Sequence, residues 1–473
     1  MIERRTFLTL SGITALHLLT GCGGGSSSGG SGSNGSSSTK ALPIPQLLGP
    51  TNRGGVNHYD LTVQASQHNF FDGTATNTYG INGTYLGPTL VMYNGSEVSV
   101  NYANQLSETI TMHSHGMHVP ARMDGTAHQP IAAGANWSAR YSVNQKACTN
   151  WYHPHTMDNT ARQVYQGLAG LIIIEDNESQ ALNLPKRYGV DDIPLVLQDK
   201  FFDNGQIDYN PSRQQVMRGY VGDTFIANGA IEPTLDVEAK EIRFRILNGS
   251  NSSVYELGFS DGRTFQQIAT DNGFLEAPVS INRLRLSPAE RAEIVVDLSN
   301  AKDQTIILNE YRHGKKFVTI NVNKDATQST TLPSRLTTLE RLNPSSAVRT
   351  RSFVLSGRMG NFEINGKSMD INRIDERVSL GEVELWEITN TMGVDHNFHI
   401  HATHFMIVDR NGSASNIAAN ERGYKDVVFV PANESVTVIV KMTDYRDSNV
   451  PYMYHCHFLE HEDRGMMGQF TVS

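Results

Sequence analysis

The sequence predicts an all-β protein with roughly three domains. Its 473 residues are enough for about three domains of ~150 residues each. Helix-type periodicity is scarce along the chain. Short strand-like runs instead alternate with turns that contain Gly, Pro, Asn and Asp. Such a succession of short strands and turns is typical of β-sandwiches or barrels.

Charge and cysteine content narrow the possible classes of protein. The net charge is -9 and the chain has no basic run, so we expect no nucleic-acid partner. The three cysteines are Cys22, Cys148 and Cys456. A disulfide framework is not expected, because Cys22 and Cys456 have other predicted roles. We expect Cys148 to be a buried free thiol rather than a metal ligand.

Residues 1–22 predict an export signal that ends in a lipidation site. Residues 4–8 (RRTFL) are similar to a twin-arginine signal, and an ordinary Sec signal with an incidental arginine pair is the alternative. The apolar run that follows is too short to span a membrane. Residues 19–22 (LTGC) resemble a bacterial lipobox, in which Cys22 would carry the lipid. The alternative is a chance cysteine near a signal peptide.

Residues 23–44 are predicted to be a Gly/Ser tether. Residues 23–39 are almost entirely Gly and Ser, and such a segment cannot bury apolar surface. A single lipid group would hold the protein at a membrane surface. We therefore expect an exported lipoprotein, periplasmic or at the cell surface, that is tethered to a membrane through its N-terminus.

Three segments are candidate domains, namely residues 45–176, 185–325 and 351–473. The first and third contain paired histidines, whereas the second contains only His313 and is predicted to be a spacer. Residues 326–350 are rich in Ser, Thr, Arg and Leu and predict an exposed linker. Residues 381–386 are similar to residues 95–100, and each run leads into a His-x-His pair, which indicates a repeated domain.

The chain is organised around residues 454–461 (YHCHFLEH), which we predict to be its last strand. Alternate side chains of a strand point to opposite faces. His455 and His457 would therefore face one side and Cys456 the other, so that one strand supplies two metal sites. Cys456, His461 and Met466 offer a thiolate, an imidazole and a thioether, as in a blue-copper site. His396 would supply the second imidazole.

Four His-x-His pairs stand out from the composition. With 17 His in 473 residues, chance predicts about 0.6 such pairs. The four pairs are His113 and His115, His153 and His155, His399 and His401, and His455 and His457. Eight imidazoles at a domain interface can hold several metal ions, and the thiolate and thioether nearby favour copper. The alternative is a set of core or surface histidines that bind no metal.

These motifs resemble those of multicopper oxidases, the family of laccases, bilirubin oxidases and a bacterial periplasmic cuprous oxidase. The resemblance extends from about residue 45 to residue 473. Ser114 stands where the family usually has Trp between the first two histidines, and we expect this change to affect packing more than ligation. The resemblance implies three cupredoxin-like Greek-key β-sandwich domains and four copper ions.

The resemblance also implies a role for each candidate ligand. Type 1 copper would be held by His396, Cys456, His461 and Met466; type 2 by His113 and His399; one type 3 ion by His115, His153 and His457; and its twin by His155, His401 and His455. Asp124 and Glu462 match family carboxylates and would be catalytic proton relays. The alternative for both is a surface carboxylate in a loop. Asp463 is left open between a group near type 1 and a solvated acid.

The implied activity is one-electron oxidation of a phenol or of a cuprous or ferrous ion, coupled to reduction of dioxygen to water. We expect a monomer. The 326–380 region has only Met359 and Met369, so a methionine-rich cover is not expected, and an open type 1 site would favour laccase-like substrates. One alternative is a non-catalytic scaffold of the same fold, as in a bacterial cell-division protein that lost its copper ligands. Another is a copper-binding or electron-carrier module, which would explain four ligands but not the other eight.

Overall fold

A computed structural model describes residues 40–328, 330–358 and 360–473. The predicted export signal, Cys22 and residues 23–39 of the tether lie outside the described residues. The predicted tether extended to residue 44, but this boundary is wrong. Ala41 pairs with Thr234, and Leu42 is buried in the core of the middle segment. The apolar side chain of Leu42 therefore anchors this part of the chain. No helix among the described residues is long and apolar enough to cross a membrane.

The strands within residues 47–175 form two sheets. The inner faces of these sheets enclose one core that includes Met92, Val100 and Ile172. The first sheet has the order β1 (Leu47–Leu48), β5 (Thr89–Tyr93), β10 (Gly170–Glu175), β9 (Cys148–His153) and β7 (His113–His115). The second has the order β2 (Thr51–Arg53), β3 (Val56–His68), β6 (Glu97–Asn104) and β8 (Asn136–Ser142), with β4 (Thr76–Ile81) paired to β3.

The strands of the middle segment also form two sheets, around a core that includes Phe244, Tyr255 and Phe317. One sheet has the order β14 (Ala230–Ile231), β13 (Thr224–Ala227), β11 (Asp192–Asp203), β16 (Glu241–Asn248), β21 (Arg291–Asp297), β18 (Phe265–Thr270) and β19 (Gly273–Ile281), with β12 (Gln206–Asp208) paired to β11. The other has the order β15 (Thr234–Glu238), β23 (Lys315–Lys324), β22 (Thr305–Glu310), β17 (Tyr255–Phe259) and β20 (Leu284–Leu286).

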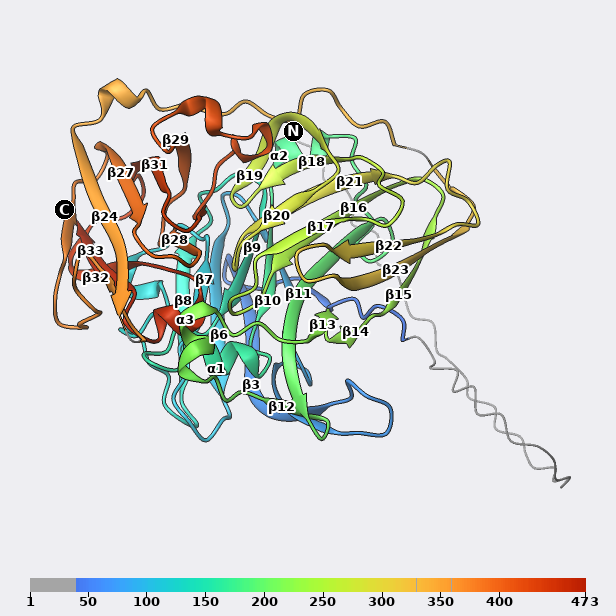
Figure 1. The fold of residues 1–473 in the computed structure, drawn as a ribbon, viewed down its shortest axis with the longest axis horizontal. Coiled ribbons are helices and arrows are strands. Elements are labelled where there is room, and N and C mark those ends of the chain that lie inside the picture. Colours follow the sequence, from blue (N-terminus) through green and yellow to red (C-terminus); the bar gives the residue numbers. More distant parts are fainter. Residues whose placement is uncertain (1–39, 329, 359) are drawn as a thin grey trace, which may run out of the picture. The chain divides into compact units, whose positions relative to one another are not determined.

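The third segment repeats this arrangement around Phe353, Trp386 and Phe398. One sheet has the order β25 (Asn361–Ile364), β24 (Arg349–Arg358), β27 (Val383–Asn390), β31 (Ser435–Lys441) and β29 (Phe405–Arg410). The other has the order β26 (Glu376–Val378), β33 (Met467–Val472), β32 (Asp447–His455), β28 (His396–Ile400) and β30 (Val427–Val430). Figure 1 shows the three groups of strands in successive colours along the chain.

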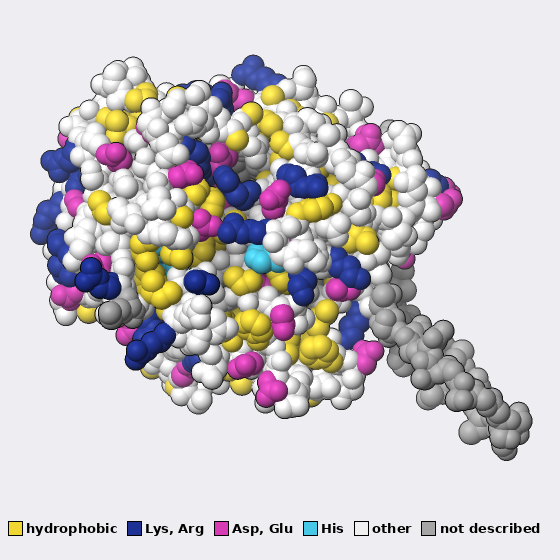
Figure 2. Space-filling view, viewed as in Figure 1, with side chains coloured by type: hydrophobic (Ala, Val, Ile, Leu, Met, Phe, Trp, Pro, Cys, Tyr) yellow, Lys and Arg dark blue, Asp and Glu magenta, His cyan; other side chains and the backbone are white. Residues whose placement is uncertain are grey.

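Helices contribute little to the fold. They are α1 (Thr160–Tyr165), α2 (Asn177–Ala181), α3 (Arg213–Arg218) and α4 (Leu459–Glu462), with 3-10 turns at η1 (Ala121–Met123), η2 (Pro344–Ser346), η3 (Ala414–Asn416) and η4 (Ala419–Glu421). The predicted all-β class with three sandwich domains is confirmed. On the face seen in Figure 2, acidic and basic side chains are interspersed.

Two local predictions were wrong. The predicted strand over residues 454–461 ends at His455; residues 459–462 form α4, and β33 is the last strand. The predicted exposed linker is partly buried, because Leu336 and Leu339 pack into two apolar clusters. Both errors have one cause. Contacts with distant parts of the chain decide the conformation there, and the local pattern of residues does not contain them.

Lys200 on β11 is a buried cation between the first two segments. Its ammonium donates to the Tyr165 carbonyl at 2.7 Å and lies 4.3 Å from the centre of the Tyr165 ring. Burial lowers the pKa of Lys200 to about 7, although the nearby Asp199 acts in the opposite direction. The folded protein thus loses this proton at a lower pH than the unfolded chain does.

We expect Lys200→Met to change how stability depends on pH. Between pH 7 and the ordinary lysine value of 10.5, the unfolded chain holds one more proton than the folded protein does. Lys200 therefore makes the free energy of unfolding increase by about 1.4 kcal/mol for each unit by which the pH rises in this range. Urea unfolding across this range should show that the variant lacks this rise. The exposed Lys315 provides a control, since Lys315→Met should keep it; an unchanged slope in Lys200→Met would contradict the assignment.

Candidate metal centre

The paired histidines lie on neighbouring strands within each of the two outer segments. His113 on β7 pairs with His153 on β9, and His399 on β28 pairs with His455 on β32. In an antiparallel pair, directly opposed residues carry their side chains on the same face. Strand pairing thus brings two His-x-His motifs together in each segment. All eight imidazoles are buried.

Three of the four predicted type 1 ligands surround one point in the third core. The Cys456 sulfur lies 3.4 Å from Nδ1 of His396 and 3.8 Å from Nδ1 of His461, and the two Nδ1 atoms are 3.1 Å apart. Met466 is buried in the same core, and its carbonyl accepts a hydrogen bond from the Cys456 N–H. These donors are the thiolate, imidazole and thioether set that suits copper.

Two of the predicted type 1 ligands lie beneath a cover. His396 and His461 are both fully buried. Nε2 of His461 hydrogen-bonds to the carbonyl of Val216 on α3 at 3.0 Å, and Nε2 of His396 lies 3.2 Å from the Met392 sulfur. The cover comes from α3 of the middle segment and not from residues 326–380.

The other predicted ligands converge on a second point. Nε2 of His455 lies 3.2 Å from Nε2 of His155 and 3.1 Å from Nε2 of His401. Nε2 of His153 lies 3.4 Å from Nε2 of His457 and from Nδ1 of His115. Two nitrogens that each lie about 2.0 Å from one ion at a tetrahedral angle are about 3.3 Å apart. The observed spacings therefore fit shared metal ions.

His113 and His399 provide an independent test of this fit. Nε2 of each ring is buried and has no hydrogen-bond partner. Nδ1 of His113 hydrogen-bonds to the Asp124 carbonyl at 2.7 Å, and Nδ1 of His399 to the Asp426 carbonyl at 2.8 Å. A carbonyl oxygen only accepts, so Nδ1 carries the proton and Nε2 keeps a free lone pair. Leaving such a buried acceptor unsatisfied is costly, and a metal ion would satisfy both.

Carboxylates orient several of the other rings. Asp124 accepts from Nδ1 of His401 at 2.8 Å, and Glu462 lies 3.1 Å from Nδ1 of His455. Asp426 accepts from Nε2 of His115 at 3.0 Å. His115 therefore directs Nδ1 at the cluster, whereas the others use Nε2. Such contacts fix the tautomer and orientation of a metal-binding imidazole.

Burial lowers the pKa of six of the eight imidazoles, those of His115, His153, His155, His399, His401 and His457. Desolvation lowers the pKa of His155 and His396 to about 4, and desolvation together with the surrounding histidines holds the pKa of His399 well below its usual value. Burial raises the pKa of Glu462, but His455 and His155 outweigh it and hold that pKa below its usual value. Burial raises the pKa of Cys456 to about 12. Copper binding at Cys456 would therefore release a proton.

Three residues near the site were missed in the sequence. Arg291, fully buried, donates to both carboxylate oxygens of Asp426 at 2.6 Å. The Asn397 carbonyl oxygen accepts from the His457 N–H at 2.6 Å, and its amide group donates to the Pro288 carbonyl at 2.8 Å. Asp426 and Arg291 are 135 residues apart, and no motif signals their pairing. Asn397 lies between two predicted ligands, which was the only available signal.

Family profiles match nearly the whole described chain. Three multicopper oxidase profiles cover residues 62–179, 149–332 and 338–473. The chain belongs to the multicopper oxidase family. Multicopper oxidase mco of Staphylococcus aureus is 36% identical over 439 residues, which are 91% of this chain and 92% of that protein. The family that the motifs resembled is therefore confirmed.

Other members of the family differ in their described roles. The cell division protein FtsP of Sodalis glossinidius is also 36% identical to this chain. The alignment covers 98% of that protein and 100% of this chain. A laccase from Pediococcus acidilactici has a TM-score of 0.86 and 36% identity over 92% of this chain and 94% of its own. A laccase-like oxidase from Ochrobactrum sp., described as acting on lignin model compounds and lignosulfonate, has a TM-score of 0.85 and 36% identity, with 91% of this chain and 100% of that one covered.

Proposed function

We propose that this multicopper oxidase oxidises phenolic or metal-ion substrates one electron at a time and reduces dioxygen to water. The observation that carries the proposal is the pair of unpartnered Nε2 atoms, on His113 and His399, within an array of eight buried imidazoles. A protein without a metal would leave these acceptors unsatisfied at a cost. The laccase and laccase-like relatives further support it.

Four copper ions would be held by the twelve predicted ligands and would supply reversible one-electron chemistry. Cys456 lies between His455 and His457 in the chain, so a short covalent path links the sulfur to both imidazoles. Asp124 and Glu462 would hold protons near the cluster. One oxygen of Asp124 is buried and has no hydrogen-bond partner, which leaves it able to accept a proton. Both residues stay proposed relays.

The choice of reductant depends on the cover over His461. A bulky phenol does not reach a buried imidazole directly, so electrons would cross the Val216 carbonyl that contacts it. A Campylobacter jejuni relative described as a metallo-oxidase, at 27% identity and a TM-score of 0.79, supports the metal-ion class. Phenols are supported by the Ochrobactrum relative. Both classes therefore stay in the proposal.

A non-catalytic scaffold is the second candidate, because this chain aligns with 92–99% of the length of several FtsP proteins. Copper binding separates the two. A scaffold has no requirement for twelve buried imidazole and sulfur donors, or for the two unpartnered Nε2 atoms of His113 and His399 among them. The oxidase proposal therefore requires metal, whereas the scaffold proposal does not.

Copper quantification and oxygen uptake test the proposed function. We expect about four copper ions per chain, a strong blue absorption band, and oxygen consumption with a phenol, cuprous ion or ferrous ion. Asp124→Asn and Glu462→Gln should slow turnover by about 100-fold or more while copper content is kept, and Glu387→Gln on the exposed side of β27 should not. A copper-free protein without oxygen uptake would favour the scaffold.

We also infer export as a membrane-tethered lipoprotein and a monomeric state. The predicted signal and lipobox over residues 1–22 support export. Labelling with a radioactive fatty acid should mark the protein, and Cys22→Ser should abolish the label. Label that persists in this variant would contradict lipidation at Cys22, and a dimer in analytical ultracentrifugation would contradict the monomer.

A further inference from the structure

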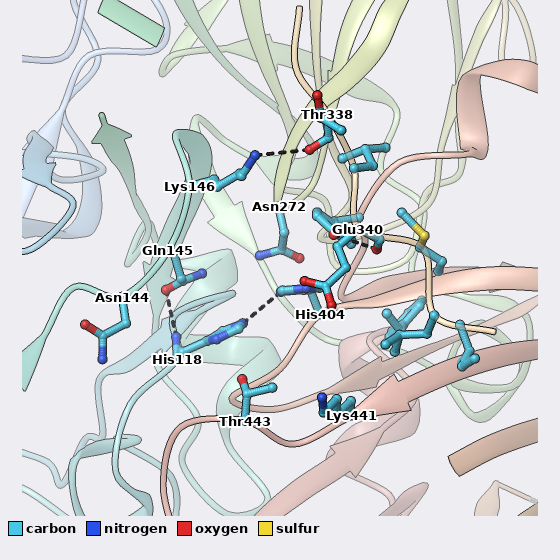
Figure 3. A pocket seen from close by; sticks show the side chains of 16 residues that line it. His118, Asn144, Gln145, Lys146, Asn272, Thr338, Glu340, His404, Lys441 and Thr443 are labelled. Carbon is cyan, nitrogen blue, oxygen red and sulfur yellow. Dashed lines mark hydrogen bonds between the residues drawn. The ribbon is translucent and has the colours of Figure 1, made fainter. Parts of the chain in front are cut away.

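A cavity of about 480 Å³ lies apart from the predicted ligands and takes side chains from all three segments and the linker. Its walls include His118 and His404, two histidines without a role in the predicted metal sites. They are 286 residues apart in the chain but lie in contact. Figure 3 shows the two rings side by side, with Asn272 above them and Lys441 below. Ligand cavities in proteins are typically about 300–1,000 Å³.

A hydrogen-bonded chain fixes which atom His404 presents. Asp444 accepts from Nδ1 of His118 at 2.8 Å, and Nε2 of His118 lies 3.2 Å from Nδ1 of His404. Burial raises the pKa of Asp444, but the hydrogen bonds and charges of His118, Thr443 and His404 together outweigh burial and lower that pKa, so the carboxylate is an acceptor. Because Nδ1 of His118 donates its hydrogen to Asp444, Nε2 of His118 accepts from Nδ1 of His404, and Nε2 of His404 is left as an acceptor.

Asn272 provides a second acceptor. Its side chain is 4% exposed, and its carbonyl oxygen is buried without a hydrogen-bond partner. Its amide group donates to the Gly116 carbonyl at 3.1 Å. Because a carbonyl can only accept, this contact fixes the orientation of the amide and leaves the oxygen without a partner, in a residue that lines the cavity. An unsatisfied buried acceptor is unusual and indicates a donor that is absent from the protein itself.

Lys441, the acidic side chain of Glu340 and an apolar wall also line the cavity. The ammonium of Lys441, at the end of β31, forms no ion pair within the described chain. Leu339, Phe405, Met406 and Ile439 are buried apolar side chains in the lining. The linker that carries Leu339 is held in place, because Lys146 donates to Thr338 and Tyr424 donates to the Glu340 carbonyl. The cavity is thus a formed site rather than a gap between loops.

We propose that this cavity binds a small hydroxylated aromatic carboxylate. The ring would lie against the apolar wall, its hydroxyl groups would donate to His404 Nε2 and Asn272 Oδ1, and its carboxylate would pair with Lys441. The site is separate from the type 1 site, where Val216 covers His461, so binding does not depend on oxidation. The proposal therefore stands apart from the proposed oxidase activity.

Calorimetric titration of the purified full chain with 3,5-dihydroxybenzoate tests this proposal. The meta hydroxyl groups of this probe cannot form a quinone, and the titration is done under nitrogen. We expect one site per chain. Benzoate lacks the hydroxyl donors and resorcinol lacks the carboxylate, so each should bind about tenfold or more weakly, because each loses a hydrogen bond to a buried or charged group.

Variants locate the site. Lys441→Met should weaken the binding of 3,5-dihydroxybenzoate about tenfold and leave the binding of resorcinol unchanged, because only the carboxylate contact is lost. His404→Phe should weaken the binding of both 3,5-dihydroxybenzoate and resorcinol. Lys315→Met removes the same charge outside the cavity and should change nothing. The proposal is overturned if the probe does not saturate, if benzoate binds equally well, or if Lys441→Met leaves the affinity of 3,5-dihydroxybenzoate unchanged.

Discussion

Replacing Cys456 by Ser is expected to bleach the blue band and to abolish turnover while copper remains in the imidazole array. The hydroxyl of Ser is a poor copper ligand compared with a thiolate. The array uses nitrogens from other side chains, and none of its rings contacts the Cys456 sulfur in the described structure. Visible absorption, copper content and oxygen uptake measured on one preparation check all three parts of this expectation.

Cys148 supplies the matched control. It is a second buried free cysteine, and burial raises the pKa of its thiol. It lies at the start of β9 in the first core, away from the sulfur-containing site. Cys148→Ser should therefore keep the colour and the activity. A blue band that survives in Cys456→Ser, or disappears in Cys148→Ser, would refute the assignment of the sulfur ligand.

Arg291→Met should destabilise the protein by about 3–5 kcal/mol, because it leaves the buried carboxylate of Asp426 without its partner. Arg291 and Asp426 are both 0% exposed at their side chains. Asp426 also accepts from His115, so we expect copper content to fall together with stability. Urea unfolding of the copper-loaded and the copper-free variant would separate these two effects.

An exposed ion pair of the same chemistry is the control for Arg291. Arg341 lies 2.6 Å from Glu276, and both side chains are about half exposed, at 50% and 46%. Solvent screens such a pair, and its loss in Arg341→Met should cost about 0–1 kcal/mol. Equal losses of stability in the two variants would show that the buried carboxylate is not held by Arg291 in the way the geometry indicates.

Local spacing predicted the ligand types and the fold class but not what surrounds them. The His-x-His pairs and the run through Cys456 were visible because neighbouring residues on a strand share a face or alternate across it. The Val216 cover and the Asp426 contact come from other segments, and no sequence spacing encodes them. The burial of Leu336 and Leu339 was missed for the same reason.

The end of the predicted last strand shows the same limit. Residues 459–462 turn into α4 and place His461 beside Cys456, whereas a continued strand would have carried His461 further along. The α4 turn contacts the other segments, since the Leu459 N–H donates to the Asn251 carbonyl and Asp463 accepts from the Thr160 N–H. Asp463, left open in the sequence, thus holds the start of α1.

The division of the eight imidazoles has a mechanical consequence. Four come from residues 113–155 and four from residues 399–457, so any metal they share fastens the early part of the polypeptide to its late part. Removal of copper by a chelator should then weaken the contact between the first and third segments before any single sandwich unfolds. Proteases would cut first in the exposed end of the linker, at residues 343–348, and adding copper back would restore resistance.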